Sequence, residues 1–176
     1  MNLWSNVFRH HRWSNRVVID YLSTLTDEQM ELTVPGTYGS SLATIRHLVS
    51  IDADYVRIIP DAPHVTQIDD AGPFGTWAEL REVAWEADSA LIGYVDGRTD
   101  DAFFVDIDDG TPFDLTTSFL LGQIIHHATE HRTQILTTLS AHAIEPPDIS
   151  VWSWRKTDEG QSVLDELRPP SGAPTR

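Results

Sequence analysis

The sequence predicts an all-α protein, a four-helix bundle with a short β-hairpin before its last helix. Four long stretches carry apolar residues at steps of three and four, the spacing that places side chains on one face of a helix. Segments rich in Pro, Gly and Asp separate these stretches. One pair of short segments flanks an Asp-Gly step, which is typical of a hairpin turn.

The first helix is expected from about Asn2 to Leu25, with apolar side chains on two neighbouring stripes that bury a broad face. His10 and His11 lie on it. Because adjacent helical residues diverge by about 100°, at most one of the two points inward, where it could act as a fourth metal ligand. The segment Thr26 to Gln29 has the form of a capping box and predicts a short helical turn.

The second helix is expected from Ser40 to Ile59, with a serine cap at its start and Pro60 at its end. Residues 60–73 are rich in Asp, Pro and Gly and are predicted to form a long connection. The third helix is expected to begin just after Thr76, which forms a second capping-box pattern with Glu79.

The hairpin is predicted over Phe103 to Thr116 around Asp109-Gly110, and it leads into the fourth helix, which ends before Pro146.

The length of 176 residues fits one domain. We expect a bundle domain over residues 1–154 and a C-terminal extension over 155–176, partly disordered because residues 169–174 consist mainly of Pro, Gly and Ser.

Composition excludes several classes of function. Acidic residues number 27 against 12 basic ones, a net charge of −15, so nucleic acid is excluded as a partner. The chain has no cysteine, which excludes disulfides and a cysteine nucleophile. No apolar run is long enough to span a bilayer, and the first residues lack a signal-peptide core. We therefore expect a cytoplasmic protein with no membrane partner.

A pair of histidines on the fourth helix is the strongest functional signal. His127 and His131 stand four residues apart, on a face that also carries Ile124 and Ile135. A single histidine on an apolar face is more often a core residue with its hydrogen bonds satisfied than a ligand. Burying the polar nitrogens of two imidazoles one turn apart is costly unless each nitrogen has a partner. A divalent cation bound to both rings would be that partner.

A third ligand should come from another helix, because catalytic zinc sites usually take three protein ligands and leave one position open. His47 on the second helix is the best candidate, since its neighbours one turn away, Ala43 and Ile51, are apolar. The other histidines fit this site less well. Surface positions are expected for His64, His126 and His142.

Several segments carry a resemblance to a known family. They are Arg12 to Asn15, Leu42 to Leu48, His127 to Gln134 with the pattern His-x-x-x-His-Arg-x-Gln, and Pro147 to Trp152. From about Asn2 to about Trp154 the chain resembles the DinB-like family, which includes YfiT-type metal-dependent hydrolases and thiol transferases. The resemblance implies a four-helix bundle with a metal held by His47, His127 and His131. His126 and Thr133 depart from the Asn and Gly of many relatives.

The resemblance also implies a range of activities. A metal-dependent transferase that uses a low-molecular-weight thiol, such as bacillithiol or mycothiol, is favoured. A metal-dependent hydrolase and a non-catalytic, stress-linked metal-binding protein are the alternatives. The expected partners are a small-molecule substrate and a second copy of the chain in a homodimer. Imidazole ligands suit several divalent metals, of which zinc is expected before nickel or iron.

Groups beside the ligands are candidates for accepting a proton or for holding the imidazoles in place. Glu130 and Gln134 flank the histidine pair, and Asp54 and Tyr55 follow His47 by about two turns. The sequence does not assign a catalytic residue.

Other kinds of site are excluded by their motifs. The sequence contains no Glu-x-x-His of a di-iron site, no phosphate-binding loop and no His-Glu-x-x-His protease motif.

Overall fold

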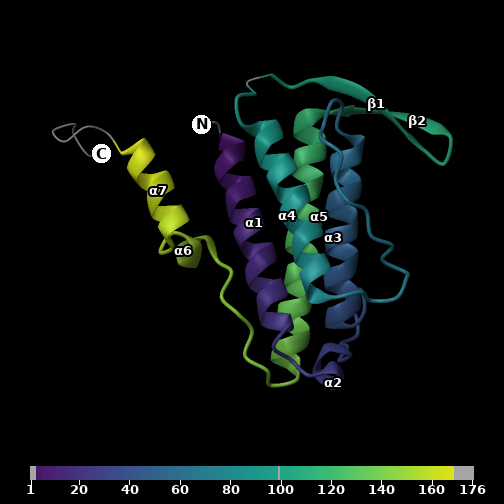
Figure 1. Ribbon diagram of the computed structural model, residues 1–176, viewed down its shortest axis with the longest axis vertical. Coiled ribbons are helices and arrows are strands. Elements are labelled where there is room, and N and C mark those ends of the chain that lie inside the picture. The colour runs from purple at the N-terminus through teal and green to yellow at the C-terminus, as the bar shows by residue number, and fades with distance from the viewer. Residues whose placement is uncertain (1–2, 99, 169–176) are drawn as a thin grey trace.

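A computed structural model describes residues 3–98 and 100–168 of the chain. Its long helices are α1 (Leu3–Leu22), α3 (Ser41–Ile58), α4 (Trp77–Val95) and α5 (Thr117–Ala141). They stand side by side in a bundle, in which α1 packs against α4 and α3 packs against both α4 and α5 (Figure 1). The all-α bundle predicted from the apolar spacing is confirmed.

The helix starts follow from their capping residues. Before α3, the side chain of Ser40 accepts a hydrogen bond from the backbone N–H of Ala43. Both predicted capping boxes form, one at the short helix α2 (Asp27–Met30) and one at α4. At α4, Thr76 accepts from the N–H of Glu79, whose carboxylate accepts from the N–H of Thr76 in return.

The hairpin also forms as predicted. Strand β1 (Phe103–Asp108) pairs antiparallel with β2 (Thr111–Thr116), and the hairpin lies at one end of the bundle (Figure 1). Asp109 and Gly110 form the turn with φ angles of 46° and 76°, a conformation that favours Asp and Gly. Thr116 then caps α5, so the hairpin leads directly into the helix that carries two of the candidate ligands.

The core runs the length of the bundle between these four helices. Its largest fully buried side chains include Ile45, Leu48, Leu91, Ile124 and Leu139, which come from α3, α4 and α5. Within the part of the chain that the structure describes, no helix is long and apolar enough to cross a membrane.

The C-terminal segment contains two helices that the sequence analysis did not predict, α6 (Val151–Trp154) and α7 (Asp158–Leu167), and both lie on the α1 side of the bundle (Figure 1). The ring of His10 donates to the carbonyl of Ile149 at 2.9 Å, and Arg12 pairs with Glu159 at 2.6 Å. Of the predicted tail, residues 169–174 lie outside the described residues. The domain boundary at residue 154 stays a prediction.

Truncation of Ile124 to Ala should destabilise the bundle by about 3 kcal/mol, because it removes a fully buried side chain and leaves a cavity. Denaturant unfolding measures this change. Phe119 lies on the same helix and is 69% exposed, so Phe119→Ala should change the free energy of unfolding by less than about 0.5 kcal/mol. Equal losses in the two variants would contradict this account of the core.

Candidate metal centre

Three histidines from two helices meet beside the core. His47 comes from α3, and His127 and His131 come from α5. Each offers a ring nitrogen, and these atoms all lie within 4.8 Å of one another. The Nε2 atoms of His47 and His127 are 3.4 Å apart. The structure therefore brings together the three residues that the sequence singled out, and their role as ligands stays a prediction.

Each imidazole has two ring nitrogens, and the hydrogen bond made by one of them shows which nitrogen is directed to the space between the three histidines. Nδ1 of His47 donates to a carboxylate oxygen of Asp70 at 2.7 Å. Nδ1 of His131 donates to the side-chain oxygen of Gln134 at 3.1 Å. A neutral imidazole that donates from Nδ1 has its lone pair on Nε2, so both rings are held with a metal-binding atom directed inward.

Tyr38 covers one side of the three histidines. Its ring stacks on His47 with centroids 4.1 Å apart and meets the ring of His131 edge to face at 5.2 Å. The side chain is 51% exposed, and its backbone N–H donates to Gln134. Burial and the neighbouring charge of Asp70 raise the pKa of the Tyr38 hydroxyl. Neither Tyr38 nor Asp70 was identified from the sequence, since both lie in connections without a helical pattern.

The surroundings of His127 and His131 favour the neutral form that a metal requires. Burial, followed by the charges of His131 and His47, lowers the pKa of His127 to about 4 despite the opposing charge of Asp52. Burial also lowers the pKa of His131, against the hydrogen bond to Gln134. Lone pairs on these rings are thus free of protons at neutral pH.

The sequence suggested four residues as proton acceptors or supports beside the candidate ligands, and only two of them contact the histidines. Gln134 contacts a candidate ligand directly, and Tyr55 packs edge to face against His127 at 5.8 Å. Glu130 and Asp54 do not reach the centre. Glu130 lies 3.9 Å from the exposed ring of His126, and Asp54 pairs with Arg57 at 3.5 Å.

The remaining histidines lie apart from the centre. His64, His126 and His142 are exposed, as predicted. Of the adjacent pair on α1, His11 is buried with 1% of its surface exposed, and His10 is half-buried. The prediction that at most one of them points inward is confirmed. His11 is not grouped with the three histidines but belongs to a separate cluster.

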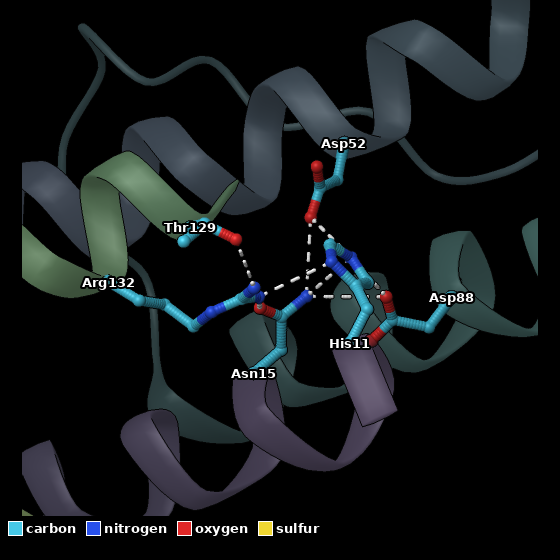
Figure 2. Close-up of polar contacts among 6 residues, drawn as sticks. All are labelled: His11, Asn15, Asp52, Asp88, Thr129 and Arg132. Atoms are coloured by element: carbon cyan, nitrogen blue, oxygen red, sulfur yellow. Dashed lines mark hydrogen bonds and ion pairs between the residues drawn. The ribbon is translucent and has the colours of Figure 1, made fainter. Parts of the chain in front are cut away.

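That second cluster is a buried polar network in which all four long helices take part (Figure 2). Nε2 of His11 lies 3.2 Å from Asp52 and 3.0 Å from Asp88. The side-chain N–H groups of Asn15 donate to the same two carboxylates at 3.2 and 3.3 Å. Arg132 donates to the side-chain oxygen of Asn15 at 2.6 Å, and the same nitrogen lies 3.3 Å from Nδ1 of His11.

The residues of this network influence one another's pKa values. Burial would lower the pKa of His11, but the charges of Asp52 and Asp88 overcome it and raise the pKa to about 9. Burial also raises the pKa of Asp88, against the attraction of His11. Because Nδ1 of His11 faces an N–H group of Arg132, we interpret the two raised values as one extra proton that His11 and Asp88 share.

Both clusters have compositions compatible with metal binding. In the buried network, the N–H groups of Asn15 and the guanidinium of Arg132 already occupy His11 and one oxygen of each carboxylate. In the described part of the chain, ring nitrogens of the three histidines lie within 4.8 Å of one another, and their hydrogen-bond partners are Asp70, Gln134 and one another rather than a cationic side chain. The three-histidine cluster is therefore the better candidate for a metal centre.

Sequence reasoning missed the buried network as a unit. Its charged members Asp52, Asp88 and Arg132 stand singly on three different helices, where an isolated Asp or Arg usually marks a solvated face. The Arg that follows the second histidine and Asn15 of the first helix were noted only as parts of motifs. His11 and Asn15 contact each other four residues apart on α1, but no local spacing signals that they meet Asp52, Asp88 and Arg132, because those contacts join residues far apart in the chain.

Comparison with known families gives one match. A family model described as the DinB family matches residues 1–158, most of the chain. No curated protein matches the sequence.

The stability of the metal-free protein should fall as pH rises from about 6.5 to about 9. In this window the folded network keeps a proton that the unfolded chain releases near the usual histidine pKa, so folding binds more protons and loses stability with increasing pH. Thermal unfolding across this range measures the effect. Asp88→Asn removes one of the two carboxylates and should flatten the dependence, and an equally steep fall in the variant would contradict the shared proton.

Proposed function

We propose that this chain, which belongs to the DinB family, binds one divalent metal ion through His47, His127 and His131 and uses it to activate a small nucleophile. The observation that carries the proposal is the orientation of the imidazoles. Two of the three rings are held at Nδ1 by Asp70 and Gln134, so that their Nε2 atoms are directed to a common point. Outer contacts of this kind fix the tautomer and raise the basicity of a ligand.

Three neutral protein ligands and an open fourth position are typical of catalytic rather than structural zinc sites. A divalent cation held in this way would supply Lewis acidity, polarising a thiol or a water in the open position. The chain's own residues orient the imidazoles and limit access. Asp70 fixes the ring of His47, and Tyr38, stacked on that ring, separates one side of the centre from solvent.

Transfer of a low-molecular-weight thiol is the activity that we propose first. The chain has no cysteine that could compete for the open position, and 17% of the His47 side-chain surface is exposed, which leaves access for a small molecule. Hydrolysis by an activated water would use the same position and is the second candidate. A metal-binding protein without turnover, linked to stress, is the third.

Further features of the proposal come from the family resemblance and the ligand type. Zinc is proposed as the metal, with nickel or iron as alternatives that imidazole ligands also accept. A homodimer in the cytoplasm is proposed as the working form.

Untagged wild-type protein should contain about one divalent metal per chain by elemental analysis, as expected for a single three-ligand site. His47→Ala and His131→Ala should each lose the metal, because each removes one of three ligands. His126→Ala is the matched control on α5, since its ring is 76% exposed, and it should retain the metal. Metal retained in both ligand variants, or lost in the control, would contradict this site.

Turnover of electrophilic substrates should require both an added low-molecular-weight thiol and bound metal. His127→Ala should abolish it by removing a ligand, whereas His126→Ala should not. Parallel assays with and without thiol, followed by mass spectrometry of the products, measure this requirement. Equal turnover without thiol would identify a hydrolase, and no turnover in any metal-loaded assay would favour the binding protein.

A further inference from the structure

Two buried polar atoms near the three histidines have no hydrogen-bond partner within the described residues. One is Nδ1 of His127, the outer nitrogen of the only candidate ligand whose ring is not held by Asp70 or Gln134. The other is Oδ1 of Asp52. With a metal on Nε2, the proton of a neutral His127 lies on Nδ1, which is then a buried donor without a partner. A buried donor and a buried acceptor without partners each cost free energy, and for a carboxylate oxygen the cost is large.

The two atoms belong to facing helices. Asp52 lies on α3 and His127 on α5, and these helices pack against each other. Tyr55, about one turn after Asp52 on α3, contacts the ring of His127 edge to face at 5.8 Å, so this part of α3 faces His127. The charge of Asp52 is also among the influences on the pKa of His127.

The two oxygens of Asp52 have different surroundings. Oδ2 lies 3.2 Å from His11 Nε2 and accepts from the side chain of Asn15 at 3.2 Å. Figure 2 shows the other oxygen pointing away from the network. One carboxylate therefore has one oxygen in the buried network and one oxygen outside it.

Other groups near His127 do not fill the role of partner. The hydroxyl of Tyr55 has a partner, since it accepts from Gln123 at 3.2 Å, and a neutral phenol is a weaker acceptor than the unpartnered carboxylate oxygen of Asp52. Glu130 is exposed and lies 3.9 Å from the ring of His126 on the solvent side of α5. Asp52, fully buried, is the remaining acceptor.

We propose that Asp52 is the positioning residue of His127, joined to its Nδ1–H by one buried water. This inference rests on the proposed metal centre and deepens it. A water between a buried donor and a buried acceptor satisfies both and is nearly as favourable as a direct hydrogen bond. A carboxylate acting on the outer nitrogen of a ligand histidine fixes its tautomer with the lone pair on Nε2.

The consequence is a continuous connection from the centre to the buried network. His127 is linked through Asp52 to His11 and Asn15, and Asn15 is bonded to Arg132. Arg132 follows the ligand His131 directly on α5. The polar network that joins the helices thereby also orients His127, whose Nδ1 has no direct hydrogen bond to a side chain.

The test compares Asp52→Asn with Asp88→Asn as a matched control. Both aspartates are fully buried and both contact His11 and Asn15, so both variants disturb the network. In Asp52→Asn, the N–H donors of His11 and Asn15 favour the amide oxygen on the network side, which places an NH₂ group where Oδ1 stood. Only this variant replaces the acceptor proposed for His127.

Zinc affinity, measured by competition with a chromophoric chelator, should fall about ten- to a hundredfold in Asp52→Asn. In Asp88→Asn it should fall much less, because this variant disturbs the network without replacing the acceptor of His127, although thermal unfolding of the metal-free protein should show that both variants are destabilised. The absorption spectrum of the cobalt-loaded protein should shift only in Asp52→Asn. Equal zinc affinities in the two variants would overturn the role of Asp52 and leave the metal centre in place.

A second measurement uses the wild-type protein, because Asp52→Asn introduces a change in a buried network that folding depends on. Nitrogen-15 NMR of the zinc-loaded protein, with His127→Gln to assign the signal, should show the proton of His127 on Nδ1 and in slow exchange with solvent, because the metal displaces the contact between the Nε2 atoms of His127 and His47. A proton on Nε2 would overturn the inference. Failure of the wild type to bind zinc would overturn the proposed function together with it.

Discussion

The bundle depends on a buried polar network at the point where its four long helices meet. Five side chains with almost no exposure to solvent contact one another there: His11 and Asn15 from α1, Asp52 from α3, Asp88 from α4 and Arg132 from α5. Burying charge is costly, so such a network is stable only when its members are present together and correctly placed. Apolar packing alone would tolerate sliding of one helix along another, whereas these directional contacts fix the relative heights of all four.

The candidate metal centre benefits from this constraint. Two candidate ligands, His127 and His131, lie on α5 and the third, His47, on α3, so the distances among their nitrogens depend on the register of those two helices. Arg132, which follows His131 directly, anchors α5 to α1 through Asn15. Asp70 and Gln134 then set the rings of His47 and His131 individually. Helix register and ring orientation are thus controlled by different residues, one set in the core and the other at the surface.

The two clusters illustrate opposite ways to accommodate histidine. In the network, two carboxylates outweigh the effect of burial and raise the pKa of His11 to about 9. Among the three histidines, burial and mutual repulsion lower the pKa of His127 to about 4. The first environment retains a proton and the second excludes it, and only an imidazole without that proton can bind a metal.

The sequence by itself determined the helices, their caps, the hairpin and the His127–His131 pair, because each rests on contacts between residues close along the chain. It also indicated His47 through helical spacing and family resemblance. The partners Asp70 and Tyr38, the helix α7 and the network around Asp52 were decided only by tertiary structure. They depend on which side chains meet across separate helices and connections, and a pattern within one segment carries no information about that meeting.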